Sequence, residues 1–545
     1  MRREGWQNWL PWLLLPLVVA SVYGHTVGHG FVWDDHLYLA NNPLYRSFAL
    51  GKILTSPGNG LEYLPVRDLS HLLDFLLWGP NPAGFHLANL VYFALAVLAA
   101  YRLASTLAAD SPGGEGSEPR LTGFVAALLF AVLPLQSEVV GFLTGRNALL
   151  STLFAFVAAT LYFRSLDEGE PLPGRRLRYA GALVAYLLAL FAKATAISLP
   201  LALAVLPLVR GGRKLRLVPL APFFLVAGGA FLLFTRIAAQ ANILRWDTAA
   251  AGGGLAGRLA TALQIPFFYL GKFLAPLTLS PEYDVIFSRY LLDPLVLAAL
   301  AGLLLLVGVA WWLRRRSPCV AVGLGWFLVT LLPVLNLLPT HPTVADRYAF
   351  LPSFGLCYLL AAGGMTLLGR RRRLLAAVLL LLAGGWGWLA HEQSRVWQSD
   401  ASLWEATIRS SPRSVKAYTN LGRIRFREGQ YDRALALFGQ AQAIEPTDPH
   451  LDYFTGVLAY SRNDIAAAQR HFVRALGRNL QFIEALYHLG LIYEAQGDPV
   501  RAAEYFRLAL RSPEPDVGTF KQLAAERLRA VSGGSTPAGS TFPGQ

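Results

Sequence analysis

The chain has little charge and almost no cysteine. Charged residues make up 15% of the sequence and hydrophobic residues 54%, whereas soluble domains carry about 25% charge. With a mean hydropathy of +0.41, this composition excludes intrinsic disorder and a purely soluble enzyme. The two cysteines, Cys319 and Cys357, both lie in apolar segments, so we expect neither a disulfide framework nor a zinc site.

The charge that is present is basic and clustered. The formal net charge is +14, and arginines gather beside apolar runs, as at 314–316 and 370–373. Such clusters are typical of the cytoplasmic ends of membrane spans rather than of a basic groove, so we expect no nucleic-acid partner. Arg2 and Arg3 precede an apolar stretch without a clear cleavage site, which predicts a retained first span and a cytoplasmic N-terminus.

Apolar runs long enough to cross a bilayer recur through residues 1–391. A spanning helix needs about 20 mostly apolar residues. The segment 258–280 contains two prolines and a lysine, so we interpret it as interfacial or re-entrant. With about eleven spans, the basic loops share the cytoplasmic side, and the residues after the last span lie on the outer face. The predicted spans are 10–28, 85–107, 121–136, 147–164, 178–192, 196–209, 217–235, 293–313, 319–338, 350–369 and 374–391.

From Ala417 onward the composition becomes that of a soluble domain, and residues recur every 34 positions. This is the period of the tetratricopeptide repeat, a helix pair that buries its apolar face against its neighbours. The sequence predicts an all-α protein: a polytopic membrane domain, a connecting helix at 392–412 and a repeat solenoid at 413–531. The repeats fall at about 415–448, 449–482 and 483–516, before a capping helix and a disordered tail at 532–545. The recurring positions are Gly422, Gly456 and Gly490; Ala434, Ala468 and Ala502; Phe438, Phe472 and Phe506; Ala441, Ala475 and Ala509.

The first outer loop, at about 29–84, opens with two adjacent aspartates, Asp34 and Asp35. One carboxylate of such a pair can take a proton from an incoming hydroxyl while its neighbour raises its basicity or orients the acceptor. The alternative is that Asp35 only caps a helix starting near His36. Farther along the loop, leucines at helical spacing predict an amphipathic helix on the membrane, whose polar face carries His71 and Asp74.

Five blocks of sequence resemble the transmembrane and tetratricopeptide-repeat O-mannosyltransferases and their bacterial relatives. These are polytopic glycosyltransferases of the GT-C class. The blocks follow the family's order and, with the repeats, cover nearly the whole chain. They are FVWDDHLYLANNP (31–43), NPAGFHLANL (81–90), LLFAVLPLQSEVVGFLTGRNALLS (128–151), ADRYAFLPS (345–353) and RVWQSDASLWEATIRSSP (395–412).

The resemblance implies an enzyme that transfers a sugar, mannose in the family, from a polyprenyl-phosphate donor to protein Ser or Thr hydroxyls. The transfer would invert the anomeric carbon on the non-cytoplasmic face of a bacterial inner membrane. It implies Asp34 as the general base and Asp35 as the supporting carboxylate. We expect no bound cofactor and no protein metal site, since glutamine and leucine stand where the family has histidines beside Glu138.

Basic residues on the predicted outer face are candidates for holding the donor phosphate. They are Arg146, Lys193 and Arg347. Arginine suits a bidentate grip on phosphate, and lysine acts as a point charge. The alternative for each is a side chain that only snorkels to the membrane interface. Glu138 and Asp346 complete the candidate substrate site.

Two classes of function remain open. The alternative to the enzyme is a non-catalytic, membrane-anchored repeat scaffold for assembling envelope protein complexes. An anchor needs only one or two spans and has no use for an aspartate pair, which favours the enzyme. The repeats would present a concave surface to an acceptor protein or to an assembly partner, and an apolar groove between spans would take the isoprenoid tail.

Overall fold

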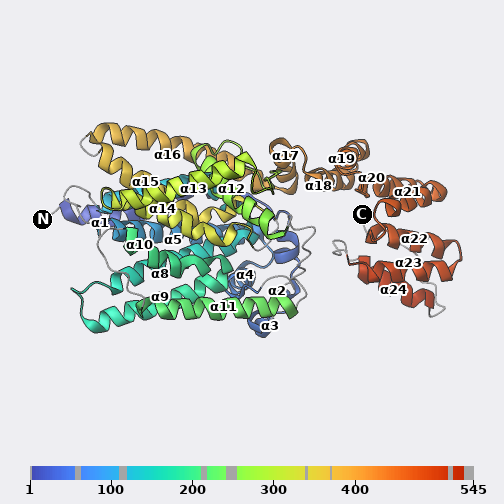
Figure 1. Cartoon of the computed structure of the whole chain (residues 1–545). Helices are drawn as coiled ribbons and strands as arrows, with labels where there is room; N and C mark the ends of the chain where they lie inside the picture. Colours follow the sequence, from blue (N-terminus) through green and yellow to red (C-terminus); the bar gives the residue numbers. More distant parts are fainter. Residues whose placement is uncertain are drawn as a thin grey trace. The chain divides into compact units, whose positions relative to one another are not determined.

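The computed structural model describes residues 3–55, 63–109, 119–209, 218–240, 254–337, 342–368, 371–513 and 520–532. Within these ranges the regular secondary structure is entirely helical, as predicted. The chain divides into two compact units, Met1–Leu403 and Trp404–Gln545 (Figure 1). The predicted disordered tail, apart from Ser532, lies outside the described residues.

The long helices of the first unit run roughly side by side, with the short helices α2, α3 and α4 of the first loop gathered at one end (Figure 1). α8 packs against α5 and α9, and α14 packs against α15. The long helices are α1 (Arg3–Tyr23), α5 (Pro82–Ala109), α6 (Pro119–Val132), α8 (Arg146–Ser165), α9 (Leu172–Ala192), α10 (Leu199–Val209), α11 (Ala221–Gln240), α12 (Gly254–Leu274), α13 (Pro294–Leu313), α14 (Pro318–Leu331), α15 (Phe350–Leu368) and α16 (Arg372–Ser394).

Each predicted span overlaps a helix, but not every helix has the length and composition of a span. Among the described residues, seven helices are long and apolar enough to cross a membrane: α1, α5, α8, α11, α13, α15 and α16. α6 joins them only if it forms one span with the helix after it, from which it is bent by 58°. The chain is therefore a multi-pass membrane protein, while the count of about eleven stays a prediction.

The other predicted spans differ from the seven in length or charge. α9 carries three arginines, Arg175, Arg176 and Arg178, in its first half, and α10 and α14 are short. α12 covers most of the segment interpreted as interfacial or re-entrant and contains Pro266. Its relation to the membrane stays a prediction.

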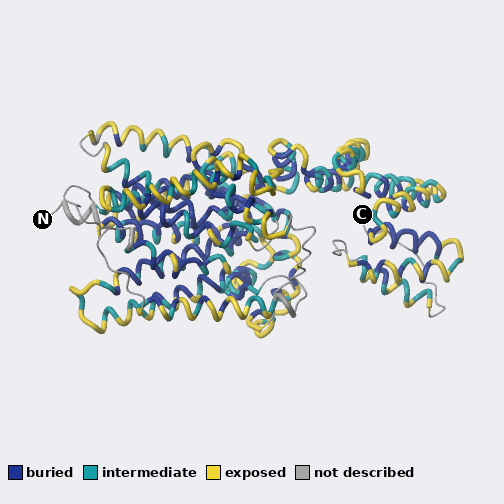
Figure 2. Tube along the Cα trace, in the orientation of Figure 1, coloured by how far each residue is buried: buried dark blue, intermediate teal, exposed yellow. Residues whose placement is uncertain are grey.

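Burial separates central helices from peripheral ones (Figure 2). The candidate span Leu143–Ser165, which consists of η4 and α8, is 78% buried inside the protein. The candidate span formed by α13 is only 11% buried. Small residues permit the closest approach: a Cβ on Gly323 of α14 would lie 2.5 Å from the carbonyl oxygen of Gly355 in α15. Such backbone contact is typical of helix packing in membranes.

Short elements connect the long helices at the positions of the candidate site. In the first loop α4 turns its polar side inward: His71 and Asp74 are buried, whereas Leu76 and Leu77 are exposed. The predicted amphipathic helix therefore exists, with its polar face against the protein. The short elements are η1 (Gly24–Gly28), η2 (His36–Ala40), α2 (Pro43–Arg46), α3 (Leu50–Thr55), α4 (Pro65–Trp78), η3 (Pro134–Gln136), α7 (Ser137–Gly141), η4 (Leu143–Gly145), η5 (Ala194–Ser198), η6 (Val218–Leu220), η7 (Leu332–Val334), η8 (Asp346–Tyr348) and η9 (Arg395–Gln398).

The junction after the last long helix is broken rather than one helix over 392–412. α16 ends at Ser394, η9 follows, and Ser399 is extended before α17 (Asp400–Ser410) begins. The break directs Asp400, the first residue of α17, toward the first loop, where it binds Trp33 and His36.

After α17, the described residues of the second unit form three helix pairs and a closing helix, which confirms the predicted tetratricopeptide array. The recurring glycines explain the period, because a Cβ on Gly422, Gly456 or Gly490 would lie 2.4–2.7 Å from the phenylalanine ring of the same repeat. The recurring alanines are fully buried. The helices are α18 (Val415–Arg427), α19 (Tyr431–Ile444), α20 (His450–Ser461), α21 (Ile465–Arg478), α22 (Ile483–Ala495), α23 (Pro499–Arg511) and α24 (Phe520–Ser532).

Candidate active site

The two aspartates of the first loop occupy different environments. Asp35 is fully buried, and its Oδ1 accepts hydrogen bonds from the backbone N–H and the hydroxyl of Thr144, at 2.8 and 2.7 Å. Its Oδ2 accepts from the N–H of Val32 at 3.3 Å. Asp34 is only half-buried. Asp35 therefore holds the loop against η4, whereas the side chain of Asp34 is partly exposed to solvent.

Asp35 does stand where a helix cap would stand, since η2 begins at His36. Its carboxylate makes no capping bond to that helix and binds Thr144 instead. Burial raises the pKa of Asp35 to about 7, while the hydrogen bonds from Thr144 and Val32 lower it and the neighbouring charge of Asp34 raises it. The charge of Asp35 is thus sensitive to pH near neutrality.

Arg347, in η8, is bound by Glu138 of α7. Its backbone N–H donates to Glu138 Oε2 at 2.8 Å, and its guanidinium forms an ion pair with Glu138 Oε1. Burial alone would lower the pKa of Arg347, but the charges of Glu138, Tyr348 and Asp34 raise it above its ordinary value. Glu138 therefore holds that guanidinium in place, and the negative charge of Asp34 has a weaker effect on it.

Asp346, the residue directly before Arg347 in the sequence, is buried. It accepts a hydrogen bond from the hydroxyl of Tyr283 at 2.6 Å. Burial, and then the charge of Glu138, raise the pKa of Asp346 well above its ordinary value, against the opposing effects of Tyr283, Lys272 and Arg347. Protonation of Asp346 is therefore easier than that of an exposed carboxyl group, and Glu138 is the carboxylate that binds Arg347.

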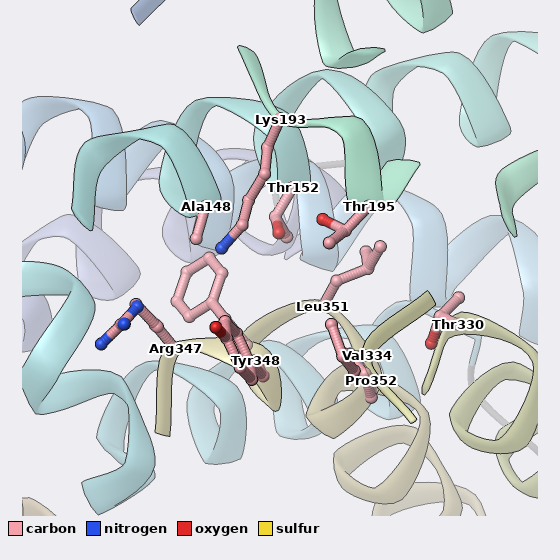
Figure 3. A pocket seen from close by; sticks show the side chains of 11 residues that line it. Ala148, Thr152, Lys193, Thr195, Thr330, Val334, Arg347, Tyr348, Leu351 and Pro352 are labelled. Carbon is pink, nitrogen blue, oxygen red and sulfur yellow. The ribbon is translucent and has the colours of Figure 1, made fainter. Parts of the chain in front are cut away.

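A pocket brings Lys193 and Arg347 together (Figure 3). The Lys193 ammonium and the Arg347 guanidinium lie 5.4 and 5.3 Å from the centre of the same ring, that of Tyr348. Thr152 and Thr195 add hydroxyl groups to the wall. The apolar part of the wall is formed by Ala148, Val334, Phe350, Leu351 and Pro352.

The free space among these side chains has room for about one water molecule, so the pocket must widen to admit a substrate group. Two cations, three threonines and an apolar side suit, in their chemistry, a small anionic group attached to an apolar chain.

Arg146 does not join this pocket. Its side chain is fully buried and pairs with Asp74 Oδ2 at 2.5 Å. It also donates to Asn89 Oδ1 at 2.6 Å and to the carbonyl of Phe85 at 2.9 Å. These partners tie α8 to α4 and α5, so Arg146 neither snorkels nor faces the pocket. A role for it in binding substrate stays a prediction.

Sequence reasoning did not identify Thr144, Asp400 or Tyr283. Asp400 accepts the backbone N–H of Trp33 at 2.7 Å, and its Oδ2 lies 2.9 Å from His36 Nε2. Thr144 and Asp400 lie inside two of the blocks quoted above, but nothing in the spacing of those blocks shows that both contact the first loop. Tyr283 lies in an irregular segment without a recognisable pattern.

Comparison with known proteins supports both units. Tetratricopeptide repeat models match residues 415–448 and 455–516. The chain is 25% identical to the Drosophila melanogaster protein O-mannosyl-transferase Tmtc3 over 86% of this chain and 59% of that protein. It is 24% identical to human TMTC3 over 94% of this chain and 59% of that protein. The predicted resemblance is thus confirmed, and the chain spans about three fifths of the length of these curated relatives.

Two solved structures show a weaker likeness. ArnT from Cupriavidus metallidurans, solved with undecaprenyl phosphate, is 16% identical, with a TM-score of 0.39 over 80% of this chain and 76% of that one. The Archaeoglobus fulgidus oligosaccharyltransferase, tethered to an acceptor peptide, is 14% identical, with a TM-score of 0.39 over 80% of this chain and 60% of that one. A score of this size is too low to establish a shared fold.

Proposed function

The chain is similar to protein O-mannosyl-transferases over most of its length, and from that premise we propose that it is a membrane glycosyltransferase. It transfers a sugar from a polyprenyl phosphate to Ser or Thr hydroxyls of an acceptor protein on the non-cytoplasmic face. The observation that carries the proposal is the position of Arg347. This residue lines the pocket with Lys193 and lies within electrostatic reach of Asp34.

In the proposed reaction the acceptor hydroxyl oxygen forms a bond to the anomeric carbon, while the bond from that carbon to the phosphate oxygen breaks. The hydroxyl proton passes to Asp34, and the polyprenyl phosphate leaves with the electron pair. Attack opposite the departing phosphate inverts the anomeric carbon. Positioning both reactants and stabilising the departing phosphate supply most of the acceleration.

The residues of the site divide these tasks. Asp34 is the half-buried carboxylate and acts as the base, whereas Asp35 is committed to Thr144 and holds the loop. Lys193 and Arg347 bind the donor phosphate, and Glu138 orients Arg347. The apolar wall formed by Val334, Leu351 and Pro352 marks the side from which the isoprenoid chain enters. The second unit recognises the acceptor protein.

The test is transfer of a radiolabelled sugar from polyprenyl phosphate to membrane proteins by the purified chain in detergent. Mannose is tried first, because the relatives are named for it. Asp34→Asn should reduce transfer by about 100-fold or more, the usual contribution of a general base, with unchanged expression. Glu392→Gln is the matched control, because Glu392 is an exposed acid that pairs with Arg395.

The outcomes separate the parts of the proposal. Full activity in Asp34→Asn would end the assignment of the base. A wild-type chain that transfers no sugar from any polyprenyl-phosphate donor would contradict the enzyme and favour the scaffold.

A further inference from the structure

Asp400 contacts the first loop at two residues. Its Oδ1 accepts the backbone N–H of Trp33 at 2.7 Å, and its Oδ2 lies 2.9 Å from Nε2 of His36. These two residues bracket the aspartate pair. Asp400 itself lies more than 360 residues away in the sequence, at the first position of α17.

The backbone at Trp33 is in an unusual conformation. Its φ angle is +52°, in the left-handed region that bulky residues rarely adopt. Such a conformation persists only where the surroundings impose it. Here the N–H of Trp33 is bound by Asp400, and its indole stacks on Phe142, with ring centres 5.5 Å apart. Phe142 in turn stacks on Trp397 at 5.1 Å.

The conformation at Trp33 sets the direction of the next side chains. The chain makes a tight turn here, in which the N–H of Asp35 donates a hydrogen bond to the carbonyl of Val32 at 2.9 Å. The turn directs the Asp35 carboxylate inward to Thr144. Asp34, the other member of the turn, stays half-buried, and its charge acts on Arg347. If Trp33 relaxed to a negative φ, the peptide joining it to Asp34 would rotate and move the Asp34 carboxylate relative to Arg347.

We propose that Asp400 is a positioning residue, which holds Trp33 in the left-handed conformation and thereby aims the Asp34 carboxylate at the acceptor hydroxyl. This inference rests on the proposed function and adds the first residue of α17, which belongs to the first unit, to the machinery of the site. Asp400 does not touch the reacting atoms. It acts through two hydrogen bonds, so an uncharged residue with the same shape can replace it.

The test compares Asp400→Ala with Asp400→Asn. In the alanine variant both bonds are lost, and kcat should fall about 10-fold or more while KM for the donor changes less than about 2-fold, because Lys193 and Arg347 are untouched. In the asparagine variant the side-chain oxygen still accepts from Trp33 and the amide donates to His36, so kcat should stay within about 3-fold of wild type. Glu392→Gln is again the control.

A second measurement does not depend on activity. Hydrogen exchange at the Trp33 amide, resolved from overlapping peptides, should become at least about 10-fold faster in Asp400→Ala and remain unchanged in Asp400→Asn. Should the alanine variant fail to fold, Asp400→Glu displaces both oxygens, keeps the charge and should behave as predicted for alanine.

Three results would overturn the inference: equal losses of kcat in the asparagine and alanine variants, unchanged exchange at Trp33, or an effect confined to KM. If the wild-type chain transfers no sugar, the proposed function fails. The exchange result then still decides whether Asp400 holds Trp33.

Discussion

Glu138 holds Arg347 through two hydrogen bonds, and replacing it with glutamine removes the charge that this arginine faces. The side chain of Glu138 is 2% exposed and that of Arg347 is 15% exposed. Glutamine has the same shape, but its amide offers one acceptor oxygen to two donors. We therefore expect Glu138→Gln to leave one N–H of Arg347 without its acceptor and to destabilise the first unit.

The magnitude follows from the environment of the pair. Removing one partner of a buried ion pair costs about 3–5 kcal/mol, and each hydrogen bond to a charged group contributes about 1.5–3 kcal/mol. The partial exposure of Arg347 reduces the loss. We expect a decrease of about 3 kcal/mol in the free energy of unfolding.

A double-mutant cycle measures the pair directly. Glu138→Gln, Arg347→Met and the double variant are unfolded by SDS in mixed micelles, with intrinsic fluorescence as the signal. The double variant should be more stable than the sum of the single effects predicts, with a coupling of about 2 kcal/mol. The exposed pair of Glu392 and Arg395, substituted in the same way, should show at most about 0.5 kcal/mol. Equal coupling in the two pairs would refute the assignment of Glu138 as the holder of Arg347.

Two further predictions concern a buried acid and a repeat glycine. Because the pKa of Asp35 is about 7 in the folded chain and 3.8 in its ordinary state, the folded state binds this proton more tightly. The stabilisation is complete below about pH 4 and is lost as pH rises through 7. The unfolding temperature of wild type, relative to Asp35→Asn, should therefore fall over this range, and a constant difference would contradict the burial argument. In the repeats, Gly456→Ala places a Cβ 2.7 Å from the Phe472 ring and should destabilise the second unit by about 1–3 kcal/mol. Gly477→Ala, where a Cβ meets nothing within 4 Å, should not destabilise it; equal calorimetric shifts in both variants would remove the packing explanation.

The residues of the candidate site show how far sequence reasoning reached. The sequence indicates Asp34, Lys193 and Arg347 as polar groups near the ends of apolar runs. Lys193 and Arg347 line one pocket, and the charge of Asp34 acts on Arg347. Arg146 was selected by the same argument, yet it lies in a separate buried cluster with Asp74 and Asn89. The position of a charged residue beside an apolar run predicts how deep in the membrane that residue lies. The helix face on which the residue lies depends on how the helices pack.

The sequence by itself determined the features that depend on composition and period. Apolar runs predict helices in the membrane because their backbone groups must bond within the segment. A period of 34 predicts repeats because each helix pair needs an identical neighbour.

The tertiary structure alone decided which of the polar residues meet. Asp35 meets Thr144 across 109 positions, and Asp400 meets Trp33 across 367. Contacts at such separations follow from the packing of whole helices, so no local pattern of residues records them.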